Sequence, residues 1–296
     1  MRIISIMNQK GGCGKTTTAI NLSAFLTEFN KKTLLIDLDP QGHATSGFNI
    51  QEDTIEADLF DVFTKKASLN DIIIRGVFKG MDLAPTTLRL SAIEQYLAGT
   101  IGRERQLRSH IEKDKHSFNY DYIIIDCPPQ LGLLGFNALV ASNEVIVPIE
   151  PSSFSLQGTE RLLETIDLLR ENVSHHPLKI MVLPTLYSHQ NLFSREILKK
   201  IREKFEPGVL KTVIRQNVRL KEAVQKGCPV FIYDPRSIGA EDYQNLTMEI
   251  IQQEKSEPAW TDMKFSDNTG VASMAAEQAR KNAVNLVADI ASFLIK

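Results

Sequence analysis

The sequence predicts a doubly wound α/β fold with a mostly parallel sheet, and three observations support that class. Short runs rich in Ile, Leu and Val recur along the chain, and segments with helical periodicity lie between them. The runs are apolar at successive positions, as strands buried on both faces are. A glycine-rich turn joins the first run to the first helical segment. Strands that alternate with helices in this way indicate a parallel sheet with helices on both faces.

The expected strands are too short and too rich in β-branched residues to be helices. They lie at 3–7, 33–37, 81–84, 122–126, 144–149, 179–184 and 230–233. Helices are expected at 16–29, 158–172 and 193–205, after the first, fifth and sixth strands. The order of the elements contains no internal repeat and no low-complexity tract.

A change in composition divides the chain near its end. Residues 254–270 are polar and rich in turn-forming residues, which is typical of a linker or loop. We therefore expect an α/β domain over 1–254, followed at 255–296 by a linker and a final helix at 273–295. The apolar stripe of that helix favours packing on the body of the domain. Docking of a partner is an alternative, and membrane anchoring is disfavoured because the polar face carries few cations.

Charge and cysteine content restrict the classes of function. The 34 basic and 36 acidic residues give a formal net charge of −2. This balance excludes binding of polyanions by bulk charge but allows a local basic patch. No apolar run reaches the roughly 18 residues that a membrane span requires. The start of the chain lacks the features of a signal peptide and the three cysteines are far apart, which favours a cytoplasmic protein.

The most informative segment is the glycine-rich turn at 10–17, Lys-Gly-Gly-Cys-Gly-Lys-Thr-Thr. Its glycines let the backbone wrap closely around an anion, and the start of the following helix adds partial positive charge. Lys15 can reach the β- and γ-phosphates of a nucleotide, and the Thr16 hydroxyl can coordinate Mg²⁺. The predicted nucleotide-binding residues are Lys10, Gly11, Gly12, Cys13, Gly14, Lys15, Thr16 and Thr17.

Acidic residues stand at the ends of two expected strands. Asp37 and Asp39 close the second strand, and Asp126 closes the fourth. Ligands of open parallel sheets bind at the carboxyl ends of strands, so we expect these carboxylates near the phosphate loop. The apolar run into Asp126 is typical of a Walker B carboxylate that holds a metal-bound water. One of the other two carboxylates can support the Mg²⁺ shell while the second orients the attacking water.

A second lysine distinguishes this turn from an ordinary phosphate loop. With Lys10 at its entrance, the turn resembles the deviant Walker A motif of the ParA/MinD family of ATPases. The resemblance implies ATP and Mg²⁺ as cofactors, and a homodimer in which Lys10 reaches the phosphates bound by the other subunit. It also implies that Asp39 orients the attacking water and that Asp37 lies around the metal. Lys10, Lys15 and Asp39 are therefore the expected catalytic residues.

Further stretches are similar to the ParA (Soj-like) proteins rather than to MinD. They are 39–47, 211–223 and the segment from Gly227 to Ser237. The resemblance covers about residues 2–254 and is weakest over 50–120. It implies a partner-stimulated ATPase, associated with the nucleoid, that positions a chromosome, plasmid or other cargo through a ParB-like protein.

The distribution of charge along the sequence favours DNA as a binding partner. Residues 195–221 contain nine basic and three acidic residues, so this segment carries +6 while the rest of the chain carries −8. Such a patch suits nonspecific, salt-dependent binding to phosphates. The predicted DNA contacts are Lys199, Lys200, Arg202, Lys211, Arg215, Arg219 and Lys221.

Three other functions stay open at this point. The first is a MinD-like ATPase that works on a membrane surface through the helix at 273–295. The second is an ATP-dependent synthetase or metal-insertion protein on the same fold, for which the sequence lacks paired metal-ligating cysteines. The third is a scaffold that binds nucleotide without hydrolysing it.

Overall fold

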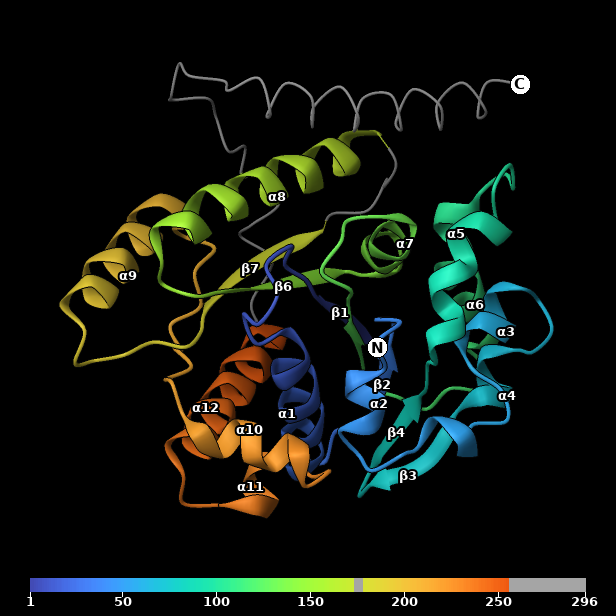
Figure 1. The fold of residues 1–296 in the computed structure, drawn as a ribbon, viewed down its shortest axis with the longest axis horizontal. Helices are drawn as coiled ribbons and strands as arrows, with labels where there is room; N and C mark the ends of the chain where they lie inside the picture. The colour runs from blue at the N-terminus through green and yellow to red at the C-terminus, as the bar shows by residue number, and fades with distance from the viewer. Residues whose placement is uncertain (173–177, 256–296) are drawn as a thin grey trace.

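The computed structural model describes residues 1–172 and 178–255. In this part of the chain, one seven-stranded sheet has the order β3-β4-β2-β5-β1-β6-β7 (Figure 1). Neighbouring strands pair in parallel except β3 and β4, which are antiparallel. The mostly parallel sheet confirms the predicted fold class. The strands are β1 (Arg2–Ile6), β2 (Thr33–Asp37), β3 (Ile74–Phe78), β4 (Met81–Ala84), β5 (Tyr122–Asp126), β6 (Glu144–Ile149) and β7 (Lys179–Pro184).

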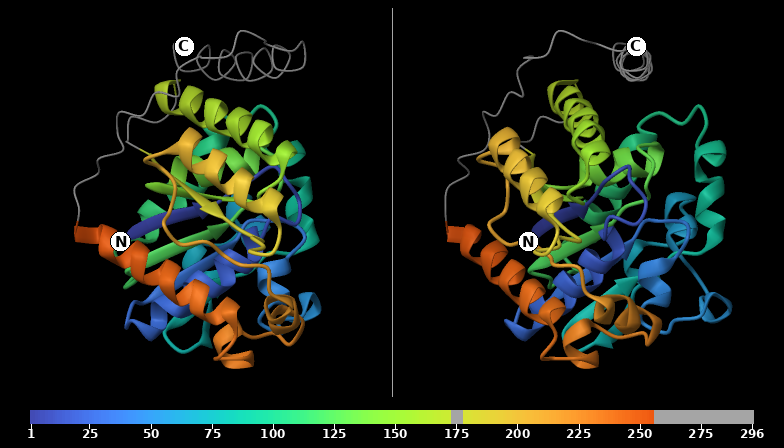
Figure 2. Two further views of the ribbon diagram at one scale, coloured as in Figure 1. Left: turned by 90° about the vertical axis from the view of Figure 1, so that its left-hand side faces the viewer. Right: turned by 60° about the vertical axis from the view of Figure 1, so that its left-hand side comes forward.

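Helices cover both faces of the sheet, as the two further views show (Figure 2). The longer ones are α1 (Lys15–Glu28), α6 (Gln106–Asp114), α7 (Leu133–Ala141), α8 (Ser153–Asn172), α9 (Leu192–Phe205), α10 (Val218–Gln225) and α12 (Ile238–Gln252). Three of these, α1, α7 and α8, each lie between two consecutive strands, as the βαβ connection of parallel pairing requires. The shorter ones are α2 (His43–Ser46), α3 (Leu59–Phe63), α4 (Leu69–Ile72), α5 (Ile93–Tyr96) and α11 (Val230–Tyr233).

The core has two halves, one on each face of the sheet. Successive residues of a strand point to opposite faces, so Ile123 and Ile125 pack into one half and Ile124 into the other. The first half includes α7 and α8, and the second includes α1 and α12. Because both faces are covered, the central strands are apolar at successive positions along most of their length, which is why the sequence identified them.

Two strand assignments differ from the sequence-based expectation. Residues 230–233, expected to be a strand, form the helix α11 instead. Only Val230 is fully buried there and Ile232 is 54% exposed, so the segment does not have the two covered faces of a central strand. The edge strand β3 was not expected, because the exposed Arg75 and Gly76 interrupt its apolar run.

Some expectations fall outside the described residues. The linker and final helix expected within 255–296 lie almost entirely in the part of the chain that is not described. The division into 1–254 and 255–296 therefore stays a prediction. Among the described residues, no helix is both long and apolar enough to cross a membrane.

Arg2 ties the first strand to distant parts of the fold. Its guanidinium forms two hydrogen bonds with the Glu144 carboxylate, at 2.6 and 2.7 Å. It also donates to the Tyr122 hydroxyl at 3.1 Å and to the Ile250 carbonyl at 2.7 Å. One side chain thus joins β1, β6, β5 and α12.

Replacement of this arginine should destabilise the protein. We expect Arg2→Met to lower the free energy of unfolding by about 3 kcal/mol, because the mostly buried Glu144 carboxylate loses its cation. Arg75→Met is the matched control, since it removes an exposed ion pair with Asp82 worth about 1 kcal/mol or less. Urea unfolding measures both values, and equal losses for the two variants would contradict the assignment.

Candidate functional site

The carboxyl ends of the central strands meet at one place. β5 lies between β1 and β2, and Asp126 pairs in register with both Ile6 and Asp37. The loop after β1 leads into α1, and Lys15 and Thr16 at the start of that helix lie close to Asp126. The sheet therefore brings together residues that are far apart in the sequence.

The phosphate loop has the backbone that its glycines predict. Gly12 has a φ of 72° and Gly14 a φ of 93°, in the region where L side chains are strained. A Cβ atom at Gly12 would meet nothing within 4 Å, so open space lies beside the loop. The Thr185 hydroxyl donates to the Cys13 carbonyl at 2.8 Å and fixes the loop to the end of β7. No side chain caps α1, so its first N–H groups can bind an anion.

The two lysines of the loop have different surroundings. Lys15 is 7% exposed, and its Nζ donates to the Lys10 carbonyl at 3.1 Å. The Lys10 ammonium forms an ion pair with Glu150, which directly follows β6. The hydroxyls of Ser152 and Ser155 lie 3.4 and 3.3 Å from the same Nζ. Lys15 is therefore held inside the loop, whereas the Lys10 side chain lies across its entrance and is 40% exposed.

Asp37 and Asp126 are both fully buried. Oδ2 of Asp37 accepts hydrogen bonds from the amide and the hydroxyl of Thr45, both at 2.7 Å. Oδ1 of Asp37 and both oxygens of Asp126 have no hydrogen-bond partner among the described residues. Burial raises the pKa of Asp37 to about 7. Burial and the neighbouring Asp37 carboxyl together raise the pKa of Asp126, so a nearby cation would favour ionisation of this pair.

These unpartnered oxygens fit Mg²⁺ by the chemistry of the donor set. Mg²⁺ prefers oxygen ligands, keeps several waters and is held by few protein groups together with phosphates. The Thr16 hydroxyl can ligate it directly, and the buried carboxylates of Asp37 and Asp126 can hold its waters. The structure thus brings the three predicted metal residues to one place.

Asp39 differs from the buried pair. It lies beyond the end of β2, is 7% exposed and lines the same cavity as the phosphate loop. Its Oδ1 accepts a hydrogen bond from the Gln41 amide at 3.1 Å. This placement suits a carboxylate that orients a water molecule.

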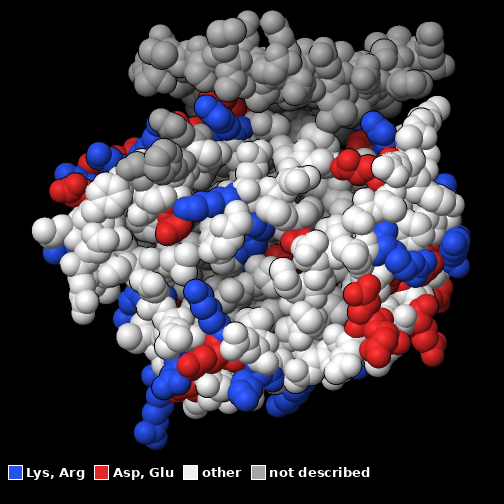
Figure 3. Space-filling view, viewed as in Figure 1, with Lys and Arg blue, Asp and Glu red and all other residues white. Residues whose placement is uncertain are grey.

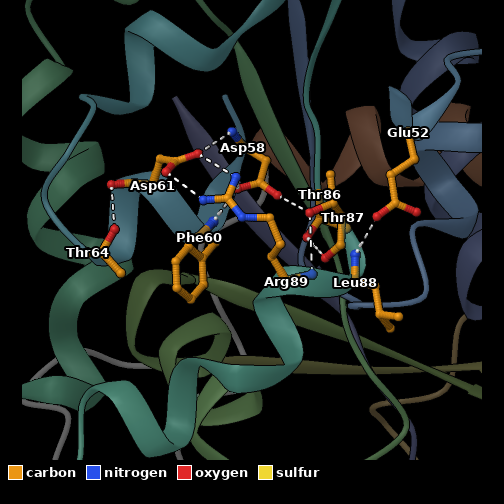
Figure 4. Close-up of polar contacts among 9 residues, drawn as sticks. All are labelled: Glu52, Asp58, Phe60, Asp61, Thr64, Thr86, Thr87, Leu88 and Arg89. Carbon is orange, nitrogen blue, oxygen red and sulfur yellow. Dashed lines mark hydrogen bonds and ion pairs between the residues drawn. The ribbon is translucent and has the colours of Figure 1, made fainter. Parts of the chain in front are cut away.

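A polar network links the start of α3 with the segment after β4 (Figure 4), and that segment contacts Thr45, which binds Asp37. The Thr45 hydroxyl accepts a hydrogen bond from the Thr86 amide at 3.3 Å. The next residue, Thr87, donates its hydroxyl hydrogen bond to Asp58, which is fully buried, and the Arg89 guanidinium lies 3.6 Å from the same carboxylate. The segment after β4 and the start of α3 therefore fix the position of α2, and through α2 that of Asp37.

A cavity of about 750 Å³ lies beside the phosphate loop and Asp39, and its size suits a nucleotide. Residues of the phosphate loop and Asp39 line it, and so do apolar side chains from the loops after β7 and from α10. The apolar lining residues are Leu186, Ile214, Val218 and Leu220. Sequence reasoning missed this part of the site, because its residues come from separate loops and form no motif.

The predicted DNA contacts lie in two groups. The first group is on α9, and the second lies on α10 and in the segment that precedes it (Figure 1). Lys and Arg gather over the same side of the molecule in the space-filling view, together with acidic residues (Figure 3). The first group is Lys199, Lys200 and Arg202, and the second is Lys211, Arg215, Arg219 and Lys221.

Part of this positive charge already has a partner. The Arg215 guanidinium contacts the buried Asp242 carboxylate at 2.5 Å, which raises the pKa of Arg215. Arg219 forms an ion pair with Glu222 at 2.7 Å. Lys221 lines the nucleotide cavity. The surface available to an anionic partner is therefore smaller than the charge count implied.

Comparisons with known proteins agree with the geometry of the site. Residues 1–180 match the family described as "AAA domain". The sporulation initiation inhibitor protein Soj of Bacillus subtilis is 42% identical over 249 residues, which is 84% of this chain and 98% of Soj. The chromosome partitioning protein ParA of Caulobacter vibrioides is 37% identical over 260 residues, 88% of this chain and 97% of that protein.

The solved structure of a synthase is also similar to this chain. The crystal structure of cobyrinic acid a,c-diamide synthase from Mycobacterium smegmatis, with bound ATP analog and magnesium, is 31% identical with a TM-score of 0.77. The match covers 86% of this chain and 96% of that one. The phosphate loop, the paired strand-end carboxylates and these matches agree, and the chain belongs to the ParA/MinD family of deviant Walker A P-loop ATPases, with Soj and ParA among its relatives.

Proposed function

We propose that the chain is a partitioning ATPase that dimerises around two molecules of ATP with Mg²⁺. In the ATP state the dimer binds DNA without sequence preference. Hydrolysis, stimulated by a ParB-like partner, releases the DNA and so positions a chromosome, plasmid or other cargo in the cytoplasm, on the nucleoid.

The observation that carries this proposal is the placement of Lys10. Its ammonium lies at the entrance of the phosphate loop, on Glu150, while Lys15 alone lies within the loop. A cation in this position is accessible to a second chain. There it would act as an arginine finger does, by placing positive charge where negative charge builds up on the transferred phosphoryl group.

Each remaining group has one part in the reaction. The N–H groups of the loop and the Lys15 ammonium bind the phosphates, and the apolar residues around Val218 accommodate the base. Mg²⁺ bound at Thr16 would neutralise phosphate charge and allow the two buried carboxyl groups to ionise. Asp39 accepts a hydrogen bond from the attacking water and orients it toward the γ-phosphate.

The relatives favour partitioning over synthesis. The synthase structure is 31% identical to this chain, which is a lower identity than that of Soj or ParA. The metal-insertion alternative requires paired cysteines, whereas Cys13 and Cys127 are both buried and free. No described residue supports the membrane alternative, because the helix on which it depends lies outside the described part.

Asp39→Ala tests the hydrolytic assignment. We expect turnover to fall by about a hundredfold, because the water loses its orienting carboxylate. ATP should still bind and should hold the protein as a dimer in light scattering. Lys15→Ala is the control that should lose ATP binding altogether, and an Asp39→Ala protein with normal turnover would contradict the role of this carboxylate.

Lys10→Ala and Glu150→Gln test action across the dimer. Without Lys10, each chain should bind ATP through its own Lys15 yet stay monomeric in sedimentation with ATP and Mg²⁺. Glu150→Gln releases Lys10 from its ion pair, so the dimer should form at roughly two- to fivefold lower protein concentration. A Lys10→Ala protein that dimerises as the unaltered chain does would exclude the proposed arrangement.

Arg219→Glu tests the DNA surface. We expect weaker binding to DNA of any sequence and a smaller dependence of affinity on salt, because about one phosphate contact per chain is lost. Lys115→Glu has the same change in charge at an exposed position after α6 and serves as the control. Fluorescence anisotropy in the ATP state measures both, and equal losses would place the DNA surface elsewhere.

A further inference from the structure

The loop between Asp126 and α7 is fixed mainly at its two ends. At its start, the Cys127 amide donates to the Ile6 carbonyl at 3.3 Å. Pro128 and Pro129 have no N–H, and no backbone hydrogen bond is donated by residues 130–132 within the described chain. Pro129 lines the nucleotide cavity, so the conformation of this loop bears directly on the site.

The other end of the loop is held by a side chain from a distant segment. Glu94 of α5 accepts a hydrogen bond from the Leu133 amide, the first of α7, at 2.7 Å through Oε1. The N-cap residue of α7 is Gly132, which provides no capping side chain. The carboxylate thus takes the place of the usual N-cap and its negative charge interacts favourably with the helix dipole.

Gly132 leaves room for this contact. A Cβ atom at that position would come too close to Oε1 of Glu94, so a side chain there would force the carboxylate to shift. The helix that carries Glu94 is itself anchored, because Ile93 and Leu97 are buried in the core. A cavity of about 180 Å³ beside the contact gives the loop room to move when the contact is lost.

We propose that Glu94 is a positioning residue for ATP hydrolysis. By holding the first amide of α7, it fixes the loop that follows Asp126, and it sets the turnover rate rather than the affinity for nucleotide. Glu94 touches neither the phosphates nor the metal site, and it acts through the loop. This inference rests on the hydrolysis step of the proposed function and not on DNA or the stimulating partner.

The first experiment measures the contact between Glu94 and the Leu133 amide in the absence of nucleotide. In hydrogen exchange, Glu94→Ala should accelerate exchange of the Leu133 amide by about tenfold, because a hydrogen bond to a charged acceptor is lost. Glu94→Gln keeps an acceptor oxygen and should change the exchange rate of this amide less than about threefold. Gln95→Ala, on the exposed side of the same helix, is the control. Unaltered exchange in Glu94→Ala would overturn the proposal whether or not the chain hydrolyses ATP.

The second experiment measures steady-state turnover. Glu94→Ala should lower kcat about fivefold or more with KM for ATP within about twofold, and Glu94→Gln should restore most of the rate. A fall confined to KM, or an unchanged kcat, would overturn the positioning role. Failure of the unaltered chain to hydrolyse ATP would count against the proposed function, while the exchange result would still decide the anchor.

A double substitution separates positioning from general damage. Gly132→Ala should lower kcat in the unaltered chain, because the new methyl group displaces the Glu94 carboxylate. In the Glu94→Ala background the same change should cost less than about twofold, since the clash is gone and the two effects are not additive. Equal losses in both backgrounds would show that the glycine serves another purpose and would overturn the argument.

Discussion

Two carboxyl groups buried side by side impose the main constraint on this structure. Asp37 and Asp126 end adjacent strands in register, and three of their four oxygens have no hydrogen-bond partner among the described residues. Burial raises both pKa values and the Asp37 carboxyl raises that of Asp126 further, so the pair is poorly satisfied in the free chain. A cation beside the phosphate loop removes this penalty. Binding of a metal–nucleotide complex is therefore favoured by the same arrangement that destabilises the free site.

The two lysines of the loop differ from the buried carboxyl groups, because each lysine has a partner within the chain. Lys15 donates to a backbone carbonyl, and Lys10 pairs with Glu150. A bound phosphate must replace these partners. The attraction between its oxygens and the ammonium groups is therefore partly offset by the loss of the internal contacts. For Lys10 the competing contact is an ion pair that is partly open to solvent and hence weak. In the proposed dimer, exchange of Lys10 from Glu150 to a phosphate of another chain would therefore cost little free energy, and small changes near Glu150 would shift it.

The sequence predicted the parts of the fold and site that depend on local patterns. Central strands are recognisable because both of their faces are buried, and the phosphate loop because its glycines need unusual backbone angles. The strand β3 and the helix α11 were missed or assigned wrongly, since each has one exposed face and a pattern too short to identify. The apolar part of the cavity and the contact of Glu94 with Leu133 have no local signal at all. They arise only when residues far apart in the sequence are brought together by the sheet.

Each chemically important loop is held by a side chain from a different segment of the chain. Thr185 after β7 holds the phosphate loop, Thr45 of α2 holds Asp37, and Glu94 of α5 holds the loop after Asp126. The anchors lie on separate elements, and two of them, α2 and α5, are single helical turns with exposed residues. Short elements at the surface are displaced at lower free energy than the central strands. A protein or second subunit bound there could alter the loops without entering the cavity, which gives hydrolysis a physical route to external control.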